Sequence, residues 1–159
     1  TVFLDGGSTT ELIASQIPED IDLTVICWSL NVLCIVAGKP NVKTIVLGGR
    51  YHDTSGVFAG TEGVEQLKRI RVTKAFMSAN GVEPELGVTC SNGFEVPIKE
   101  AALRSSLTKI LVVDSTKLGR VMSDHFADAG DFDDIITDGP VDPELLGKFK
   151  RHGVSITAA

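Results

Sequence analysis

Asp5-Gly6-Gly7-Ser8-Thr9-Thr10 is the stretch of sequence that decides the fold. It follows a short apolar run, Val2-Phe3-Leu4, which predicts a buried strand, and it precedes 11–17, where the apolar residues recur on one side of a helix. A strand, a glycine turn and a helix in this order bring the backbone N–H groups at the helix start to one spot. Such a spot favours a bound anion.

The side chains of the same stretch suit a phosphorylated ligand. The hydroxyl groups of Ser8, Thr9 and Thr10 add hydrogen-bond donors, and Asp5 at the strand end can accept from sugar hydroxyls. The pattern matches neither the Walker loop nor the dinucleotide fingerprint. The alternative interpretation is a tight strand-to-helix turn in which Ser8 caps the helix.

The remaining chain alternates strands and helices. Its strands are continuous apolar runs, which is typical of a parallel sheet covered by helices on both faces. We therefore predict an α/β, Rossmann-like, open and mostly parallel sheet. Further strands are expected at 23–27, 42–47, 73–78, 109–113, 134–137 and 154–156, with helices at 31–37, 61–69 (capped by Thr61), 94–105 and from Asp142-Pro143 to about 150–152. The segment 48–60 is read as an excursion with a short strand at 57–59, 85–92 as a loop, and the surroundings of His125 as irregular.

Composition excludes several classes of function. The 159 residues carry a net charge of −6 without a basic cluster, so we do not expect the domain to bind nucleic acid by itself. No apolar run is long enough to cross a membrane. The three cysteines fit neither a disulfide framework nor a zinc site and suggest buried thiols in a reducing cytoplasm. Because the chain begins at Thr1, directly in the first strand, we expect a single domain, 1–159, from a longer protein.

Polar residues gather where the predicted strands end, and in an open parallel sheet these ends meet at the ligand site. They include Trp28–Asn31, Gly48–Arg50, Asn80-Gly81, and Asp114 with Lys117. Simpler interpretations stay open: Glu95 and Lys99 could form a solvated ion pair one helical turn apart, and Lys117 could be a solvated loop lysine. Trp28 could stack on a ligand or cover a hydrophobic patch, and we favour the patch. The histidines show no metal-ligand spacing, and Cys27 and Cys34 are read as core residues.

Together these residues resemble the C-terminal effector-sensing domain of DeoR-family transcriptional regulators. The resemblance runs from one end of the chain to the other, in order. The matching stretches are Asp5–Thr10, Trp28–Asn31, Leu47–Tyr51, Ser55–Gly60, Lys74–Met77, Asn80–Val82, Gly87–Thr89, Glu95 with Lys99, Asp114–Gly119 and Ile135–Asp138. The family's fold is similar to that of ribose-5-phosphate isomerase and the CoA-transferases.

The resemblance implies a sensor of phosphorylated sugars, with no cofactor and no metal ion. Operator DNA would be bound only by a separate helix-turn-helix domain, and the protein would be a homo-oligomer without membrane contact. The ligand-binding residues are expected to be Asp5, Gly6, Gly7, Ser8, Thr9, Thr10, Gly49, Arg50, Asn80, Gly81, Glu95, Lys99 and Lys117. This chain has Cys27-Trp28-Ser29 where the family usually has Thr-Asn-Ser, which bears on the choice of sugar.

Three functions follow. The first is a non-catalytic sensor whose ligand modulates DNA binding by an attached domain. The second is a sugar-phosphate isomerase or deaminase of the same fold, with Glu95 or Asp114 as general base. The third is a purely structural oligomerisation domain. The clustered polar strand ends favour the first two.

Overall fold

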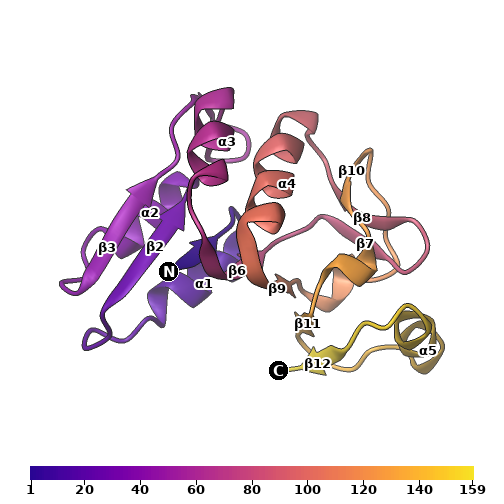
Figure 1. The fold of residues 1–159 in the computed structure, drawn as a ribbon. Coiled ribbons are helices and arrows are strands. Elements are labelled where there is room, and N and C mark those ends of the chain that lie inside the picture. The colour runs from indigo at the N-terminus through magenta and orange to yellow at the C-terminus, as the bar shows by residue number, and fades with distance from the viewer.

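The computed structural model of the protein describes residues 1–159, which form an α/β fold around one parallel sheet. The sheet has seven strands, and every neighbouring pair is parallel. From one edge to the other the strands are β12 (Ile156–Ala158), β11 (Asp134–Thr137), β9 (Ser106–Val112), β6 (Val72–Met77), β1 (Val2–Leu4), β2 (Leu23–Cys27) and β3 (Val42–Val46) (Figure 1). The predicted fold class is therefore confirmed.

The strand order reverses at β1. From β1 the chain adds β2 and β3 on one side, and it later adds β6, β9 and β11 on the other. The chain therefore leaves β1 toward α1 on one face of the sheet, and it leaves β6 toward Val82 and the core on the other face. In open α/β sheets this point of reversal is where ligands bind.

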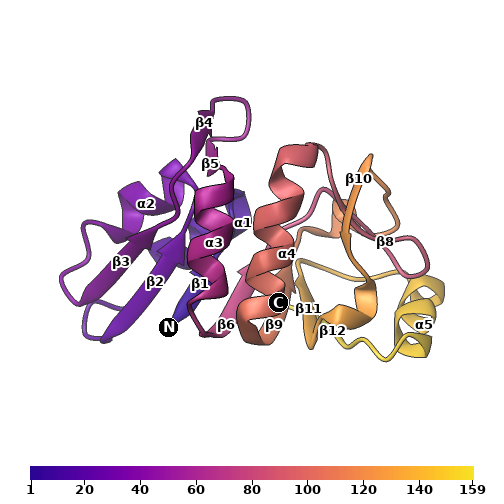
Figure 2. The same cartoon turned by 45° about the horizontal axis from the view of Figure 1, so that its top comes forward.

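Helices cover both faces of the sheet. α1 (Ser8–Ser15) and α2 (Leu30–Val36) pack on one face, where Ala14 and Val36 join Leu4 and Val25 in a small apolar cluster. α3 (Thr61–Lys68) and α4 (Val96–Ser105) lie side by side on the other face, as Figure 2 shows. α5 (Pro143–Arg151) lies near the C-terminus and begins, as predicted, at the N-cap Asp142 with Pro143 in its first turn.

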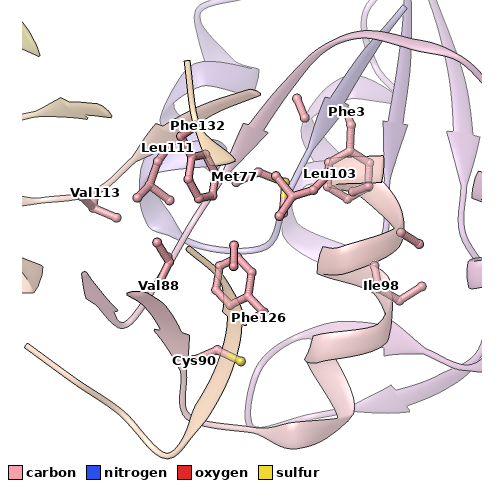
Figure 3. Packing of buried hydrophobic residues seen from close by; sticks show 14 of the residues in the cluster. Phe3, Met77, Val88, Cys90, Ile98, Leu103, Leu111, Val113, Phe126 and Phe132 are labelled. Atoms are coloured by element: carbon pink, nitrogen blue, oxygen red, sulfur yellow. The ribbon is translucent and has the colours of Figure 1, made fainter. Parts of the chain in front are cut away.

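The larger core lies between the sheet and α4. Phe3, Met77 and Leu111 come from three adjacent strands and belong to this core together with Ile98 and Leu103 of α4. Figure 3 shows Met77 next to Leu103, and Leu111 next to Phe132. Because successive side chains of a strand point to opposite faces, Phe3 enters this core while its neighbour Leu4 enters the cluster under α1. Both faces of the central strands are thus buried, which explains why the strands read as continuous apolar runs.

Two small antiparallel sheets were not predicted in full. β4 (Arg50–His52) pairs with β5 (Val57–Ala59), so the segment 48–60 forms a hairpin with two strands instead of the single expected one. β7 (Gly81–Glu83), β8 (Gly87–Cys90) and β10 (Asp124–Ala127) form the second sheet. The expectations of a loop at 85–92 and of irregular structure around His125 are therefore wrong. The strands are only three or four residues long, and β8 and β10 pair across more than 30 residues, which local patterns do not reveal.

Helix starts and exposure also differ from expectation at several positions. The N-cap of α1 is Gly7, not Ser8, and that of α3 is Gly60, not Thr61. Leu12 on α1 is 62% exposed, and Cys34 is exposed and not a core residue. Short 3-10 helices span Gly93–Glu95, Ser115–Lys117 and Ala129–Asp131, and the last strand, β12, begins two residues later than predicted.

None of the helices has the length and apolar character that crossing a membrane requires.

Candidate functional site

A cavity of about 330 Å³ lies at the carboxyl ends of β1, β6 and β9, at the point where the strand order reverses. Its volume falls within the range of small-molecule sites, about 300–1,000 Å³. Most of the residues around it are polar or glycine: Gly6, Gly7, Ser8, Thr9, Thr54, Ser55, Ser78, Asn80, Ser91, Asn92, Glu95, Asp114 and Lys117, with Val57, Ala79, Val112 and Val113.

The wall on the α1 side is the start of that helix. Gly7 is the N-cap with a φ of 138°, a backbone conformation that suits glycine, and no side chain caps the helix. The first N–H groups of an α-helix have no partner within the helix, so those of Ser8 and Thr9 remain available beside the cavity. A Cβ atom on Gly6 would lie 2.8 Å from Val57 Cγ1, so the turn also needs glycine to pass under β5.

Lys117 contributes a positive charge at the end of β9. Its ammonium group lies 3.6 Å from Oδ2 of Asp114, and about a third of the side chain is exposed. The hydroxyl of Thr116 donates a hydrogen bond to Asp114, which is the main reason why the pKa of this carboxyl lies below its ordinary value; Lys117 lowers it further. Asp114 therefore stays ionised and holds Lys117 at the cavity.

Asp5 lies beneath the cavity and is fully buried. Oδ1 of Asp5 accepts from the N–H of Gly6 and from Nε1 of Trp28, each at 2.8 Å. Oδ2 accepts from the N–H of Ser78 at 2.9 Å and from Nζ of Lys99 at 2.6 Å. One carboxylate thus ties together the ends of β1, β2 and β6 and the helix α4, and it holds the glycine turn in place from below.

Lys99 and Glu95 are one helical turn apart, but they are buried rather than solvated. Lys99 Nζ also donates to the carbonyl of Ser78 at 3.1 Å and lies 3.8 Å from Oε2 of Glu95. Lys99 is 1% exposed and Glu95 9%, so the alternative of a solvated surface pair is wrong. Lys99 belongs to the floor under the cavity, whereas Glu95 lines the cavity itself.

The hairpin β4–β5 brings in residues that the sequence did not single out. Its tip carries Thr54 and Ser55 to the cavity. Oγ of Ser55 donates to Oε1 of Glu95 at 3.3 Å, and Nδ2 of Asn92 donates to the same oxygen at 2.8 Å. Asn92 stands three residues before Glu95, a spacing that could have indicated its role; Ser55 is 40 residues away and gave no local signal.

The predicted ligand-binding residues fall into three groups. Gly6, Gly7, Ser8, Thr9, Asn80, Glu95 and Lys117 line the cavity. Three others lie buried below it: Asp5, Lys99 and Thr10, whose hydroxyl donates to the carbonyl of Gly7 at 2.7 Å. The last three, Gly49, Arg50 and Gly81, lie outside its lining, Gly49 packed against the backbone of β5 and Gly81 against that of Arg120. Trp28 is fully buried in the core, as favoured from the sequence.

A second, more apolar hollow of about 590 Å³ lies next to the cavity on the α1 side of the sheet. It is lined by Leu12, Ile13, Phe76, Val112 and Ile136, among others, and shares Ser8, Thr9 and Asp114 with the cavity. Its apolar lining offers few hydrogen bonds, so a hydroxylated anion fits the polar cavity better. No group of three or more His, Cys, Asp or Glu side chains in the protein is placed to hold a metal ion.

Comparison with known proteins gives the family. Residues 1–139 match the model of the DeoR C terminal sensor domain. The chain is 33% identical over 138 residues to the deoxyribose operon repressor of Escherichia coli (strain K12), which covers 87% of this chain and 55% of that protein. It is 32% identical over 160 residues to the lactose phosphotransferase system repressor of Lactococcus lactis subsp. lactis, covering 99% of this chain and 62% of the relative.

The match to the DeoR C terminal sensor domain covers most of the chain, and the parallel α/β sheet agrees with the fold that the resemblance implied. The chain belongs to the DeoR C-terminal sensor domain family, as the resemblance indicated. The HTH-type transcriptional regulator IolR of Bacillus subtilis (strain 168) is another relative, 27% identical over 99% of this chain and 63% of its own length. The chain therefore spans a little more than half of the length of the curated relatives that it matches.

Proposed function

We propose that the chain is the non-catalytic, effector-binding domain of a bacterial repressor of sugar metabolism, and that its cavity binds a phosphorylated sugar. The observation that carries the proposal is the meeting of an uncapped helix start with the ammonium group of Lys117 in one cavity. Backbone N–H groups at a helix start and a lysine ammonium group commonly bind a phosphate group, and the helix dipole favours its negative charge. The names of two relatives, which refer to deoxyribose and lactose, support a sugar as the rest of the ligand.

Ligand binding would regulate DNA binding by a separate helix-turn-helix domain, as the relatives' description as repressors suggests. For this, the ligand must bind more tightly to one of two conformational or oligomeric states. We expect the whole protein to act in the cytoplasm as a homo-oligomer and to contact its operator only through that separate domain. Size-exclusion chromatography with light scattering, with and without ligand, measures the oligomeric state directly.

A thermal-shift screen tests ligand binding. Ribose 5-phosphate, deoxyribose 5-phosphate, fructose 6-phosphate and tagatose 6-phosphate are compared with the same sugars without phosphate. A ligand present at about 100 times its Kd stabilises the folded state by about 2.7 kcal/mol, which raises the Tm by several degrees in a domain of this size. We expect such a shift with at least one phosphorylated sugar and none with its parent. Equal shifts with both, or none at all, would contradict the proposal.

The same compounds test the alternative function. Glu95 and Asp114 are the carboxylates that an isomerase or deaminase could use as general base, because both line the cavity. We expect no turnover of ribose 5-phosphate or glucosamine 6-phosphate above background. Turnover that is abolished by Glu95→Gln or Asp114→Asn would establish an enzyme in place of a sensor.

A further inference from the structure

Glu95 is a buried carboxylate with one oxygen left without a hydrogen bond. Oε1 accepts from Asn92 and Ser55, at 2.8 and 3.3 Å. Oε2 has the ammonium group of Lys99 as its charged neighbour, at 3.8 Å, which is beyond hydrogen-bond distance. Oε2 is open to the cavity and not fully buried, because Thr137 Oγ1 is the only fully buried side-chain oxygen or nitrogen without a partner. Because Glu95 lines the cavity, the missing donor can come from a ligand.

The charges around the cavity do not balance. Lys99 lies 2.6 Å from Asp5, which is closer than its 3.8 Å distance to Glu95. Lys117 lies 3.6 Å from a different carboxylate, that of Asp114. Asp5, Glu95 and Asp114 supply three negative charges against the two positive charges of Lys99 and Lys117, which leaves one negative charge in excess. Glu95 has the most distant partner of the three carboxylates, since it lies 3.8 Å from Lys99 and shares that ammonium group with Asp5, which lies closer.

The two ends of the cavity therefore differ in character. The helix start of α1 approaches from one face of the sheet and attracts an anion. On the opposite face the start of α4 already carries a negative charge, because Glu95 is its N-cap residue, and this charge repels a second anion. A ligand whose phosphate lies at the start of α1 presents its other end toward Glu95. A hydroxyl group there would donate to Oε2, and a second phosphate or a carboxylate would face a like charge in a partly buried site.

We propose that Glu95 is a specificity-determining residue that restricts the cavity to ligands with one phosphate and an uncharged, hydroxyl-bearing far end. This inference rests on the proposed function and adds to it the class of ligand that is refused: sugar bisphosphates and sugar-acid phosphates. The excluded class follows from the charge balance of the site, so replacement of the carboxylate by an amide should relax the exclusion. The amide keeps the shape of the side chain and can still accept from a hydroxyl.

Calorimetric titration with matched ligand pairs tests this. Fructose 6-phosphate is compared with fructose 1,6-bisphosphate, ribose 5-phosphate with ribose 1,5-bisphosphate, and glucose 6-phosphate with 6-phosphogluconate. The wild-type protein should bind the member of each pair that has a single anionic group at least about tenfold more tightly, because like charges at close range strongly disfavour binding. Glu95→Gln should bring this ratio close to one. Glu100→Gln is the matched control, since Glu100 lies on α4, whose N-cap is Glu95, is paired with Arg104 and is outside the cavity lining.

The outcomes separate the two proposals. If the wild-type protein binds ligands with two anionic groups as tightly as the matched ligands with one phosphate, the role of Glu95 is refuted while the phosphate site stands. An unchanged ratio in Glu95→Gln has the same meaning. If neither inorganic phosphate nor any monophosphate binds, the proposed function itself fails and this inference falls with it. Should Glu95→Gln not fold, equal wild-type affinities for the two members of each pair would still refute the role of Glu95.

Discussion

Nζ of Lys99 lies 2.6 Å from Oδ2 of Asp5, and at most 2% of either side chain is exposed. The two residues are 94 positions apart in the sequence, and their contact joins the helix α4 to the end of β1 directly under the glycine turn. The same carboxylate accepts from Trp28 and from the backbone of Gly6 and Ser78. The position of the candidate phosphate loop therefore depends on a buried ion pair that the ligand itself does not need to touch.

Removal of the lysine charge should strongly destabilise the fold. In Lys99→Met the carboxylate of Asp5 is left buried without its counter-charge, and a loss of about 3–5 kcal/mol in the free energy of unfolding is typical of such a change. Urea denaturation at pH 7 measures it. Arg104→Ala breaks the exposed pair with Glu100 on the same helix and should cost less than about 1 kcal/mol.

The double variant Lys99→Met/Asp5→Asn should be more stable than the sum of the two single changes predicts, because neither charge is then buried alone. Additive losses would show that the two residues act independently. The ion pair would then not be what holds the turn.

Trp28 should matter through one hydrogen bond as well as through packing. Trp28→Phe keeps an aromatic ring in the core but removes the Nε1–H that donates to Asp5 at 2.8 Å. The loss of one partner of a buried carboxylate costs about 1–3 kcal/mol. Because Trp28 is the only tryptophan, its emission in the wild-type protein should be that of a solvent-shielded indole, with little quenching by acrylamide. Efficient quenching would contradict the burial of Trp28, and a Phe variant as stable as the wild type would contradict a stabilising hydrogen bond from Trp28 to Asp5.

The cysteines should differ sharply in reactivity. Cys34 is exposed on α2, whereas Cys27 and Cys90 are buried. Burial raises the pKa of Cys27 to about 11 and also raises that of Cys90, so at pH 8 neither thiol is appreciably ionised, and the thiolate is the reactive form. A thiol reagent at pH 8 should modify one residue quickly in the native protein, and Cys34→Ser should remove this fast phase. Rapid modification of two or three thiols would mean that the buried cysteines are accessible.

The effect of Asp114 on stability should depend on pH in a defined direction. The Thr116 hydroxyl and, secondarily, Lys117 lower the pKa of Asp114 in the folded protein. A carboxyl whose pKa is lowered on folding contributes stability above its unfolded pKa, near 3.9, and loses this contribution as the pH falls through the lower folded value. Asp114→Asn should therefore cost a little stability at pH 6, under about 1 kcal/mol because the side chain is 40% exposed and screened by solvent, and progressively less below pH 4.

Urea denaturation of the wild type and Asp114→Asn at pH 6, 4 and 3 measures the difference. A difference that grows as the pH falls would have the wrong sign. It would show that the carboxylate is not stabilised by its neighbours in the folded state.

The fold was predictable because its central strands carry a simple signal. Strands that are buried on both faces, such as β1 and β2, appear as continuous apolar runs, and glycine turns and cap residues such as Asp142 mark the helices between them. The antiparallel sheet was not predictable in the same way. β8 and β10 pair across more than 30 residues, and their short strands contain glycine and polar residues that are typical of loops.

The candidate site was predictable in outline for the same reason. Residues at the end of a parallel strand meet at one edge, which brings Ser8, Asn80 and Lys117 to one cavity. Which side chains face the cavity depends on contacts across the fold. Asp5 was expected to accept from a sugar, but its oxygens are occupied by donors that come from β2, β6 and α4. Ser55 reaches the cavity only because β4 and β5 fold back as a hairpin.

The central claim is that the start of α1 and Lys117 together bind a phosphate group. Calorimetric titration of the wild type, Thr9→Ala and Lys117→Ala with the best phosphorylated sugar of the screen tests it most directly. Lys43→Ala serves as a matched control, since Lys43 is exposed on β3 and lies outside the cavity lining. We predict that Lys117→Ala weakens binding about tenfold to a hundredfold, as expected for a lost charge-assisted hydrogen bond, and that Thr9→Ala weakens it less. Both variants should keep the wild-type Tm without ligand to within a few degrees, and Lys43→Ala should bind as the wild type does. Wild-type affinity in both Thr9→Ala and Lys117→Ala would contradict the account.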